Sequence, residues 1–218
     1  MENISLQFIF ILEIAILAST IVLHFSKKNL FSLFLYFIQS LSLVILLSLS
    51  GLENYSNLLA LAIASTIILK IVIIPYLFFN SINKYGLKIS AGEHLGEPLT
   101  IVFLFLLGAV SFSGFSNGLY ALNALRPEFL VLSFWSILAS VFLVVNKKGV
   151  ISQVLGILSL ENNIVSFALF SGLEQSASLQ LGITFNILIW VVVAVLFISM
   201  IYRQFGSLDT ERMRGLTE

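Results

Sequence analysis

The chain lacks cysteine altogether, contains only 3 prolines, and carries charge on only 10% of its 218 residues. Without cysteine it cannot form a disulfide, a thiolate-bound iron–sulfur cluster or a thiol nucleophile by itself. The two histidines, His24 and His94, are too few for a haem site or a metal cage. A formal net charge of zero gives no reason to expect nucleic acid as a partner.

Apolar side chains dominate what remains: 59% of the residues are hydrophobic and the mean hydropathy is +1.06. Soluble domains carry about 25% charged residues. We therefore expect an all-α, polytopic integral membrane protein, because the apolar runs are continuous rather than alternating as in barrel strands. The first run follows no basic residue and contains Glu13, so it is expected to be a retained helix rather than a signal peptide.

Seven apolar segments have close to the ~20 residues that a bilayer requires. They lie at 4–24, 30–50, 58–79, 98–117, 128–145, 150–172 and 179–202. The loops between them are short, which leaves no room for a soluble catalytic domain. We divide the chain into a four-helix N-terminal extension (1–120), a three-helix part (121–203) and a polar tail (204–218).

The basic residues alternate with these segments. Nine of the eleven Lys and Arg residues fall on one side of the seven-span topology. They are Lys27, Lys28, Lys84, Lys88, Lys147, Lys148, Arg203, Arg212 and Arg214. The positive-inside rule then places the C-terminus in the cytoplasm and the N-terminus outside.

Three ionisable side chains fall in the middle of predicted spans: Glu13, Lys70 and Glu161. Each charge costs about 2.5–3.5 kcal/mol at the centre of a bilayer on insertion scales, so it should be paired, hydrated or neutralised. Glu161 is the main candidate for a proton relay, against the alternative of a hydrogen bond that only holds two helices together. Lys70 either tunes such a relay or forms a structural ion pair with Glu13, and we favour a structural role for Glu13.

The segment around Glu161 also carries a stripe of small and polar residues suited to close helix packing. The stripe consists of Ser152, Gly156, Ser159, Asn163 and Ser166. Glu161 lies about 200° around the helix from its stripe neighbours, on a face that is otherwise apolar. We therefore expect the carboxylate to face a different neighbour from the stripe, such as another subunit.

Other polar residues have simpler expected roles. Tyr36 and Gln39 are predicted to hydrogen-bond between helices, and Pro75 is predicted to kink the third span near Lys70. The loop sequence SAGEHLGEP (90–98) resembles a metal cluster, but a solvated turn fits better because it has a single histidine. No nucleophile elbow, phosphate loop or dinucleotide fingerprint is present, so we predict no catalytic residue and no metal ligand.

The order of motifs resembles a known family. Two lysines at 147 and 148 precede a helix with a central glutamate followed by asparagine (SLENNIVSFAL), and one further helix leads to the tail SLDTERMRG. This part is similar to the K subunit of bacterial complex I. With four helices ahead of it, the whole chain resembles the hydrogenase-4 component E family. Features of that family recur as LYFIQS, LKIVIIP, Glu97–Pro98, ISQVLGILSLEN and the tail.

The resemblance implies a non-catalytic, multi-pass subunit of the inner (cytoplasmic) membrane, within a complex I-related NiFe-hydrogenase or formate hydrogenlyase assembly. It implies lipid, antiporter-like subunits and redox-arm subunits as partners, with the NiFe centre and iron–sulfur clusters in those partners and no cofactor in this chain. Glu161 would lie on the proton or ion axis, with Lys70 and Glu13 as further relay candidates. The secondary polar candidates are Asn162, Asn186, Gln39 and Tyr36.

One departure from that family concerns the last helix. K subunits carry a second acidic residue there, whereas Asn186 occupies the nearest position in this chain. Asparagine orders water but does not hold and release a proton, so a partner would have to supply the second acid. Two alternatives stay open: a K-like subunit of a multi-subunit cation/proton antiporter, and a purely structural assembly subunit.

Overall fold

The computed structural model describes residues 2–50, 57–87, 89, 92–113, 118, 127–171, 185, 189–200 and 202, and most of them are helical. The elements are α1 (Glu2–Phe25), α2 (Asn29–Ser50), α3 (Asn57–Thr66), η1 (Ile67–Ile73), α4 (Ile74–Lys84), α5 (Glu97–Ser111), α7 (Pro127–Asn146) and α8 (Val150–Phe170). A further helix covers Ile189–Met200. These residues form no strand, only two isolated bridges, so the predicted all-α class is confirmed.

Within the described residues, five helices are long and apolar enough to cross a bilayer. They are Leu6–Phe25, Asn29–Leu49, Ile63–Lys84, Pro127–Asn146 and Val150–Phe170, and they correspond to the first, second, third, fifth and sixth predicted spans. The fourth and seventh spans form shorter apolar helices in these ranges, Glu97–Ser111 and Ile189–Met200. The chain is a multi-pass membrane protein.

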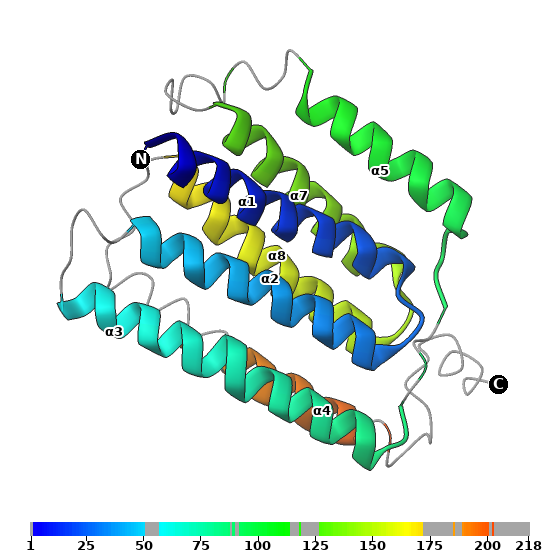
Figure 1. Cartoon of the computed structure of the whole chain (residues 1–218). Helices are drawn as coiled ribbons and strands as arrows, with labels where there is room; N and C mark the ends of the chain where they lie inside the picture. Colours follow the sequence, from blue (N-terminus) through cyan, green and yellow to red (C-terminus); the bar gives the residue numbers. More distant parts are fainter. Residues whose placement is uncertain are drawn as a thin grey trace.

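The four helices α1, α2, α7 and α8 form the centre of the bundle (Figure 1). Helix α5 lies on one flank beside α7, and the continuous α3–η1–α4 helix lies on the other flank beside α2. An apolar cluster joins α2, α4, α8 and the helix Ile189–Met200. The proposed division near residue 121 stays a prediction, but α1 and α2 pack directly on α7 and α8.

Close packing of α7 on α8 depends on the small stripe of α8, as predicted. All five stripe residues are buried. A Cβ atom added at Gly156 would lie 2.9 Å from Val144 Cγ2 and 3.4 Å from the Val144 backbone nitrogen. Because lipid is as apolar as leucine, helices in a membrane associate through such close contacts and through hydrogen bonds rather than through the hydrophobic effect.

Helix α5 is attached by one narrow stripe. Its buried residues are Thr100, Leu104, Gly108 and Ser111, whereas Phe105 is 71% exposed. A Cβ at Gly108 would meet the Trp135 ring at 2.9 Å, and the indole Nε1 of Trp135 donates to the Leu104 carbonyl at 3.2 Å. The outward apolar face of such a helix is compatible with lipid.

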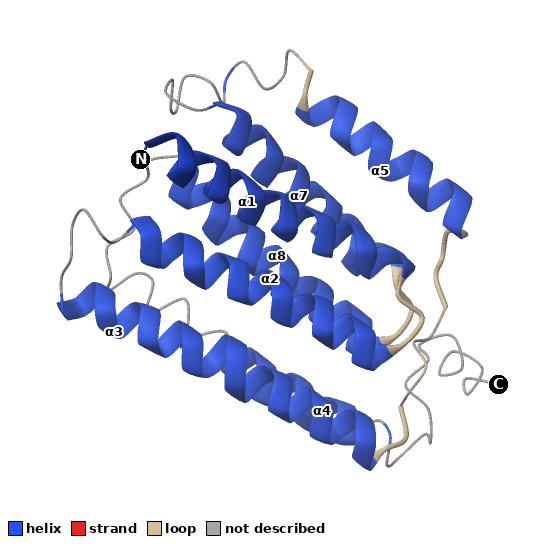
Figure 2. Cartoon of the chain, viewed as in Figure 1, coloured by secondary structure: helices blue, strands red, loops and turns tan. Residues whose placement is uncertain are grey.

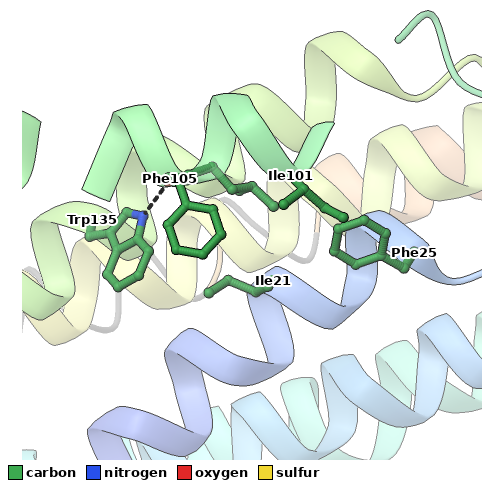
Figure 3. A pocket seen from close by; sticks show the side chains of 6 residues that line it. Ile21, Phe25, Ile101, Phe105 and Trp135 are labelled. Atoms are coloured by element: carbon green, nitrogen blue, oxygen red, sulfur yellow. Dashed lines mark hydrogen bonds between the residues drawn. The ribbon is translucent and has the colours of Figure 1, made fainter. Parts of the chain in front are cut away.

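An apolar crevice of about 130 Å³ separates α5 from α1 beside this attachment (Figure 3). Its walls are Ile21 and Phe25 of α1, Ile101, Leu104 and Phe105 of α5, and Trp135 of α7. The only polar group drawn there, the Trp135 N–H, already donates to the backbone of α5. This crevice therefore offers no chemistry for an ion or a proton.

The third span contains a π-helical segment, η1, that ends two residues before Pro75. Proline has no N–H to donate, and a wide π turn is one way to accommodate it. The buried residues Thr66, Lys70 and Ile74 follow each other at intervals of four. In a regular α-helix that spacing drifts by about 40° per step, and a wider turn keeps the three on one face.

The described parts of the α1–α2, α4–α5 and α7–α8 connections meet at one end of the bundle (Figure 2). Lys28 pairs with Ile89 and Glu93 pairs with Lys147 in isolated bridges, and the Lys148 N–H donates to the Gly92 carbonyl at 3.1 Å. Lysines of the α1–α2 and α7–α8 connections therefore lie at the same end. We call it the basic end; its cytoplasmic orientation stays a prediction.

An exposed ion pair at the basic end gives the first testable prediction. Lys27 Nζ lies 2.6 Å from Glu97 Oε1, and the lysine lowers the pKa of the Glu97 carboxyl through its hydrogen bond and charge. The contact should therefore stabilise the fold above the usual carboxyl range and be lost as the pH falls through the lowered pKa. NMR titration of Glu97 should show that pKa rising toward its usual range in Lys27→Met, and in wild type at high salt. Equal titration curves in wild type and Lys27→Met would contradict the pairing.

Candidate functional site

The centre of the candidate site is an ion pair between η1 and α8. The Lys70 ammonium donates to Glu161 Oε2 and, at 2.7 Å, to Asn162 Oδ1. Asn162 Nδ2 donates in turn to Ser40 Oγ of α2 at 3.0 Å. Lys70 is only 2% exposed, so these partners satisfy a charge that the bilayer alone could not.

The structure identifies the partners of Lys70 and Glu161, which the sequence left open. Lys70 pairs with Glu161 and not with Glu13, because the inward face of η1 is directed at the middle of α8. As predicted, Glu161 faces a different neighbour from the stripe, whose residues contact α1 and α7. That neighbour is η1 of its own chain and not another subunit. Its side chain is 17% exposed, and the neighbouring Ile157 and Ile164 are 52% and 48% exposed, so the pair lies at the edge of the bundle.

A second polar group occupies the centre of the bundle, where α1, α2, α7 and α8 meet. We call Thr20, Gln39, Ser140, Ser159 and Asn163 the polar junction; all five are fully buried. Gln39 Nε2 donates to Thr20 Oγ1 at 3.0 Å, to Ser159 Oγ at 2.9 Å and to Asn163 Oδ1 at 3.0 Å. Asn163 Nδ2 donates to Ser140 Oγ at 2.6 Å and to Thr20 Oγ1 at 3.2 Å.

The polar junction confirms the interhelical role predicted for Gln39. It also revises the division of α8 into a packing face and a chemical face, since Ser159 and Asn163 of the packing stripe carry much of this network. Tyr36, in contrast, lies fully buried in the apolar cluster between α2, α4 and α8. The amide of Asn162, adjacent in sequence, belongs to the Lys70 site instead.

Glu13 lies apart from the ion pair, between α1 and α8. It is fully buried, and its Oε2 accepts a hydrogen bond from Ser166 Oγ at 2.6 Å. Its Oε1 has no hydrogen-bond partner among the described protein atoms. Ser166, the last residue of the stripe on α8, is therefore the hydrogen-bond partner of Glu13.

The basic end holds a further buried ion pair that the sequence pattern did not single out. Lys147 is 2% exposed and its Nζ lies 3.1 Å from Glu93 Oε1. The expectation of a solvated turn is therefore wrong for Glu93, although His94 and Glu97 are exposed. The turn is held on α7 instead: Asn146 Oδ1 accepts the Leu95 N–H at 2.8 Å.

His24 is a second residue whose environment only the structure revealed. It is fully buried, its Nε2 lies 3.0 Å from the Ala139 carbonyl, and its ring stacks on Phe142 at 5.0 Å. A sequence signal was available: Glu13, Thr20 and His24 are separated by seven and four residues, which places them on one face of α1.

No metal cluster is found among these groups: in the described ranges, no three His, Asp or Glu residues come together. The assignment of the NiFe centre and iron–sulfur clusters to partner subunits stays a prediction. Asn186, Arg126 and the tail from 203 onward lie outside the described residues.

Comparison of the chain with models of known protein families, with curated proteins and with solved structures gives no match.

Proposed function

We propose that this chain is a non-catalytic membrane subunit of a hydrogenase-4-like, complex I-related respiratory assembly of the inner membrane, with the basic end in the cytoplasm. In this role Glu161 and Lys70 form one station of the proton or ion axis that the chain shares with its partners. The observation that carries the proposal is the direct contact of an acid and a base in the middle of two spanning helices. The order of sequence motifs supplies the family.

The geometry of the pair suggests how such a station works. An ionised Glu161 holds the Lys70 ammonium through charge, while Asn162 holds it through a neutral hydrogen bond. A proton arriving on Glu161 removes the charge attraction and leaves Lys70 bound by Asn162 alone. Lys70 then attracts the next anionic group more strongly, so protonation of one site is coupled to the charge of its neighbour.

The position of the pair supports an exchange with a partner subunit. Glu161 is the less buried member, at 17% exposure, between two half-exposed isoleucines. A carboxyl group on an adjacent membrane subunit could approach this edge and act as the second acid that the last helix of K subunits carries. The chain has Asn186 at that position.

The first experiment is purification of the complex under mild detergent. We expect antiporter-like membrane subunits, a NiFe large subunit and iron–sulfur proteins to accompany the chain. Antiporter-like subunits without any redox protein would instead identify the cation/proton antiporter alternative. Purification of the chain alone would remove the basis for both assignments.

The relay is tested with the charge-balanced double variant Lys70→Met/Glu161→Gln. We expect the complex to assemble and ion translocation in vesicles to be lost, because the site no longer titrates. Glu161→Asp, which keeps the acid, should retain part of the translocation. The matched control is Glu128→Gln at an exposed position in the first turn of α7, which should behave as wild type.

The purely structural alternative makes the opposite prediction for the double variant. A subunit that only holds partners together should translocate normally once the charges are balanced and the helices are packed. The polar junction is the observation that favours this alternative, since its hydrogen bonds join four helices without any charge.

A further inference from the structure

Six buried polar side-chain atoms have no hydrogen-bond partner among the described protein atoms, and three of them belong to one face of α1 or to Gln39, which donates to Thr20 on that face. These three are Glu13 Oε1, Gln39 Oε1 and His24 Nδ1. Glu13 and His24 are on α1 and Gln39 is on α2, which packs against it. Because buried polar groups are nearly always satisfied, each of these atoms points to a water or a proton at that place.

The face of α1 explains why these atoms are aligned. At 100° per residue, Glu13, Thr20 and His24 fall within about 40° of one another, and they span about 16 Å along the helix. That length is roughly half of the ~30 Å hydrocarbon thickness. All three side chains are fully buried, so this face is directed into the bundle rather than at lipid.

Hydrogen-bonding groups of α8 and α7 fill the space opposite this face. Ser166 donates a hydrogen bond to Glu13, and Asn163 lies about one turn before Ser166 on α8. Thr20 Oγ1 receives hydrogen bonds from both Gln39 and Asn163 in the polar junction. At the other end, His24 binds the carbonyl of Ala139, which directly precedes Ser140 of the junction. Two steps along this path have no direct hydrogen bond: from Ser166 to Asn163, and from Thr20 to His24. Each covers about one helical turn, and one water can bridge it.

The protonation states of Glu13 and His24 follow from their hydrogen-bond partners. Glu13 has no cation among its described contacts, because the Lys70 ammonium is bound to Glu161 and Asn162. An isolated carboxylate at zero exposure is too costly to persist, so Glu13 carries a proton. The Ala139 carbonyl can only accept, so His24 Nε2 carries the hydrogen of a neutral ring and Nδ1 offers a lone pair.

We propose that this row, from Glu13 through the polar junction to His24, is a second proton-binding path inside the chain, filled by water and separate from the Lys70–Glu161 pair. A proton released at Glu13 Oε1 passes over water and hydroxyl groups to the lone pair of His24 Nδ1, and each hydroxyl gives up one proton as it receives one. The Thr20 hydroxyl, which donates to the Ile16 carbonyl at 3.0 Å, turns away from that carbonyl for the transfer. Glu13 is left as a carboxylate until a proton returns along the same row. Nothing is oxidised or reduced. No step depends on the proposed function, because every group belongs to this chain.

The test uses infrared spectroscopy of the full-length chain in lipid vesicles, with exchange from H₂O to D₂O. We expect a carbonyl band of a buried protonated carboxylic acid that shifts in D₂O. Glu13→Gln should remove this band, whereas the double variant Lys70→Met/Glu161→Gln and Glu128→Gln should leave it in place. Should Glu13→Gln not fold, Ser166→Ala should move the band, because it removes the hydrogen bond to Oε2.

The path itself is tested by Thr20→Val, which keeps the shape of the side chain and removes the hydroxyl at the middle of the row. We expect the Glu13 band to remain and its deuterium exchange to slow by about tenfold, the factor that loss of one hydrogen bond from a transfer barrier gives. The matched control is Thr100→Val at the basic end, which should exchange as wild type. The proposal is overturned by a band that survives Glu13→Gln, by the absence of any protonated carboxyl band, or by unchanged exchange in Thr20→Val.

Discussion

Replacing Glu161 by glutamine alone is expected to lower the free energy of unfolding by about 3–5 kcal/mol, the usual result of removing one partner of a buried ion pair. The reason lies in the residue left behind. Lys70 is 2% exposed and would keep Asn162 as its hydrogen-bond acceptor but lose its counter-charge. Unfolding in mixed micelles, followed by circular dichroism, measures the change.

The converse variant should be milder. Lys70→Met leaves Glu161, which is 17% exposed and can be neutralised by a proton. The double variant Lys70→Met/Glu161→Gln should recover most of the stability, because buried ion pairs are often replaced by uncharged groups without loss. The expected order of stability is therefore the double variant close to wild type, Lys70→Met below it, and Glu161→Gln lowest. Equal stability of the two single variants would argue against a buried Lys70.

Substitution Gly156→Leu should separate α7 from α8 and lower the free energy of unfolding by at least the ~1–3 kcal/mol typical of overpacked cores. The first added atom would already lie 2.9 Å from Val144 Cγ2, and the Val144 backbone nitrogen is only 3.4 Å away, so a change of side-chain rotamer alone does not relieve the clash. Separation of these helices would also strain the hydrogen bonds that Ser140 makes with Ser159 and Asn163.

The neighbouring position supplies the control for that prediction. Ile157 is 52% exposed, so Ile157→Leu places the same side chain one residue further along α8 without a packing cost. The same micelle titration and the yield of assembled complex should separate the two variants. If Gly156→Leu were as stable as Ile157→Leu, α7 and α8 would not be in the close contact described here.

The Lys70–Glu161 ion pair shows which features of the candidate site can be predicted from the sequence. The mid-span positions of Glu13, Lys70 and Glu161 can be read from the sequence, because a charge among twenty apolar residues is conspicuous. Their pairing cannot, because it depends on which helices are neighbours and on the rotation of each. The π turn of η1 changes that rotation, and a single proline is a weak signal for it.

The stripe of α8 shows the same limit in a different way. Its intervals of four and three residues correctly predicted a buried packing face. They did not reveal that Asn163 would meet Gln39, or that Ser166 would meet Glu13, because each contact joins residues more than a hundred positions apart. The Glu93–Lys147 ion pair at the basic end was not predicted for the same reason, because the loop and the helix terminus that carry these residues come together only in the folded chain.

By itself the sequence determined that this is a helical membrane protein, where most of its spans lie, and which face of α8 is buried. These properties are local, because hydropathy and helical periodicity act over one turn or one span. The tertiary structure alone decided that Lys70 pairs with Glu161, that Glu13 is left to Ser166, and that Gln39 joins α1, α2 and α8. Those choices are non-local, because polar groups in lipid bind whichever partners the packing of the helices brings within reach.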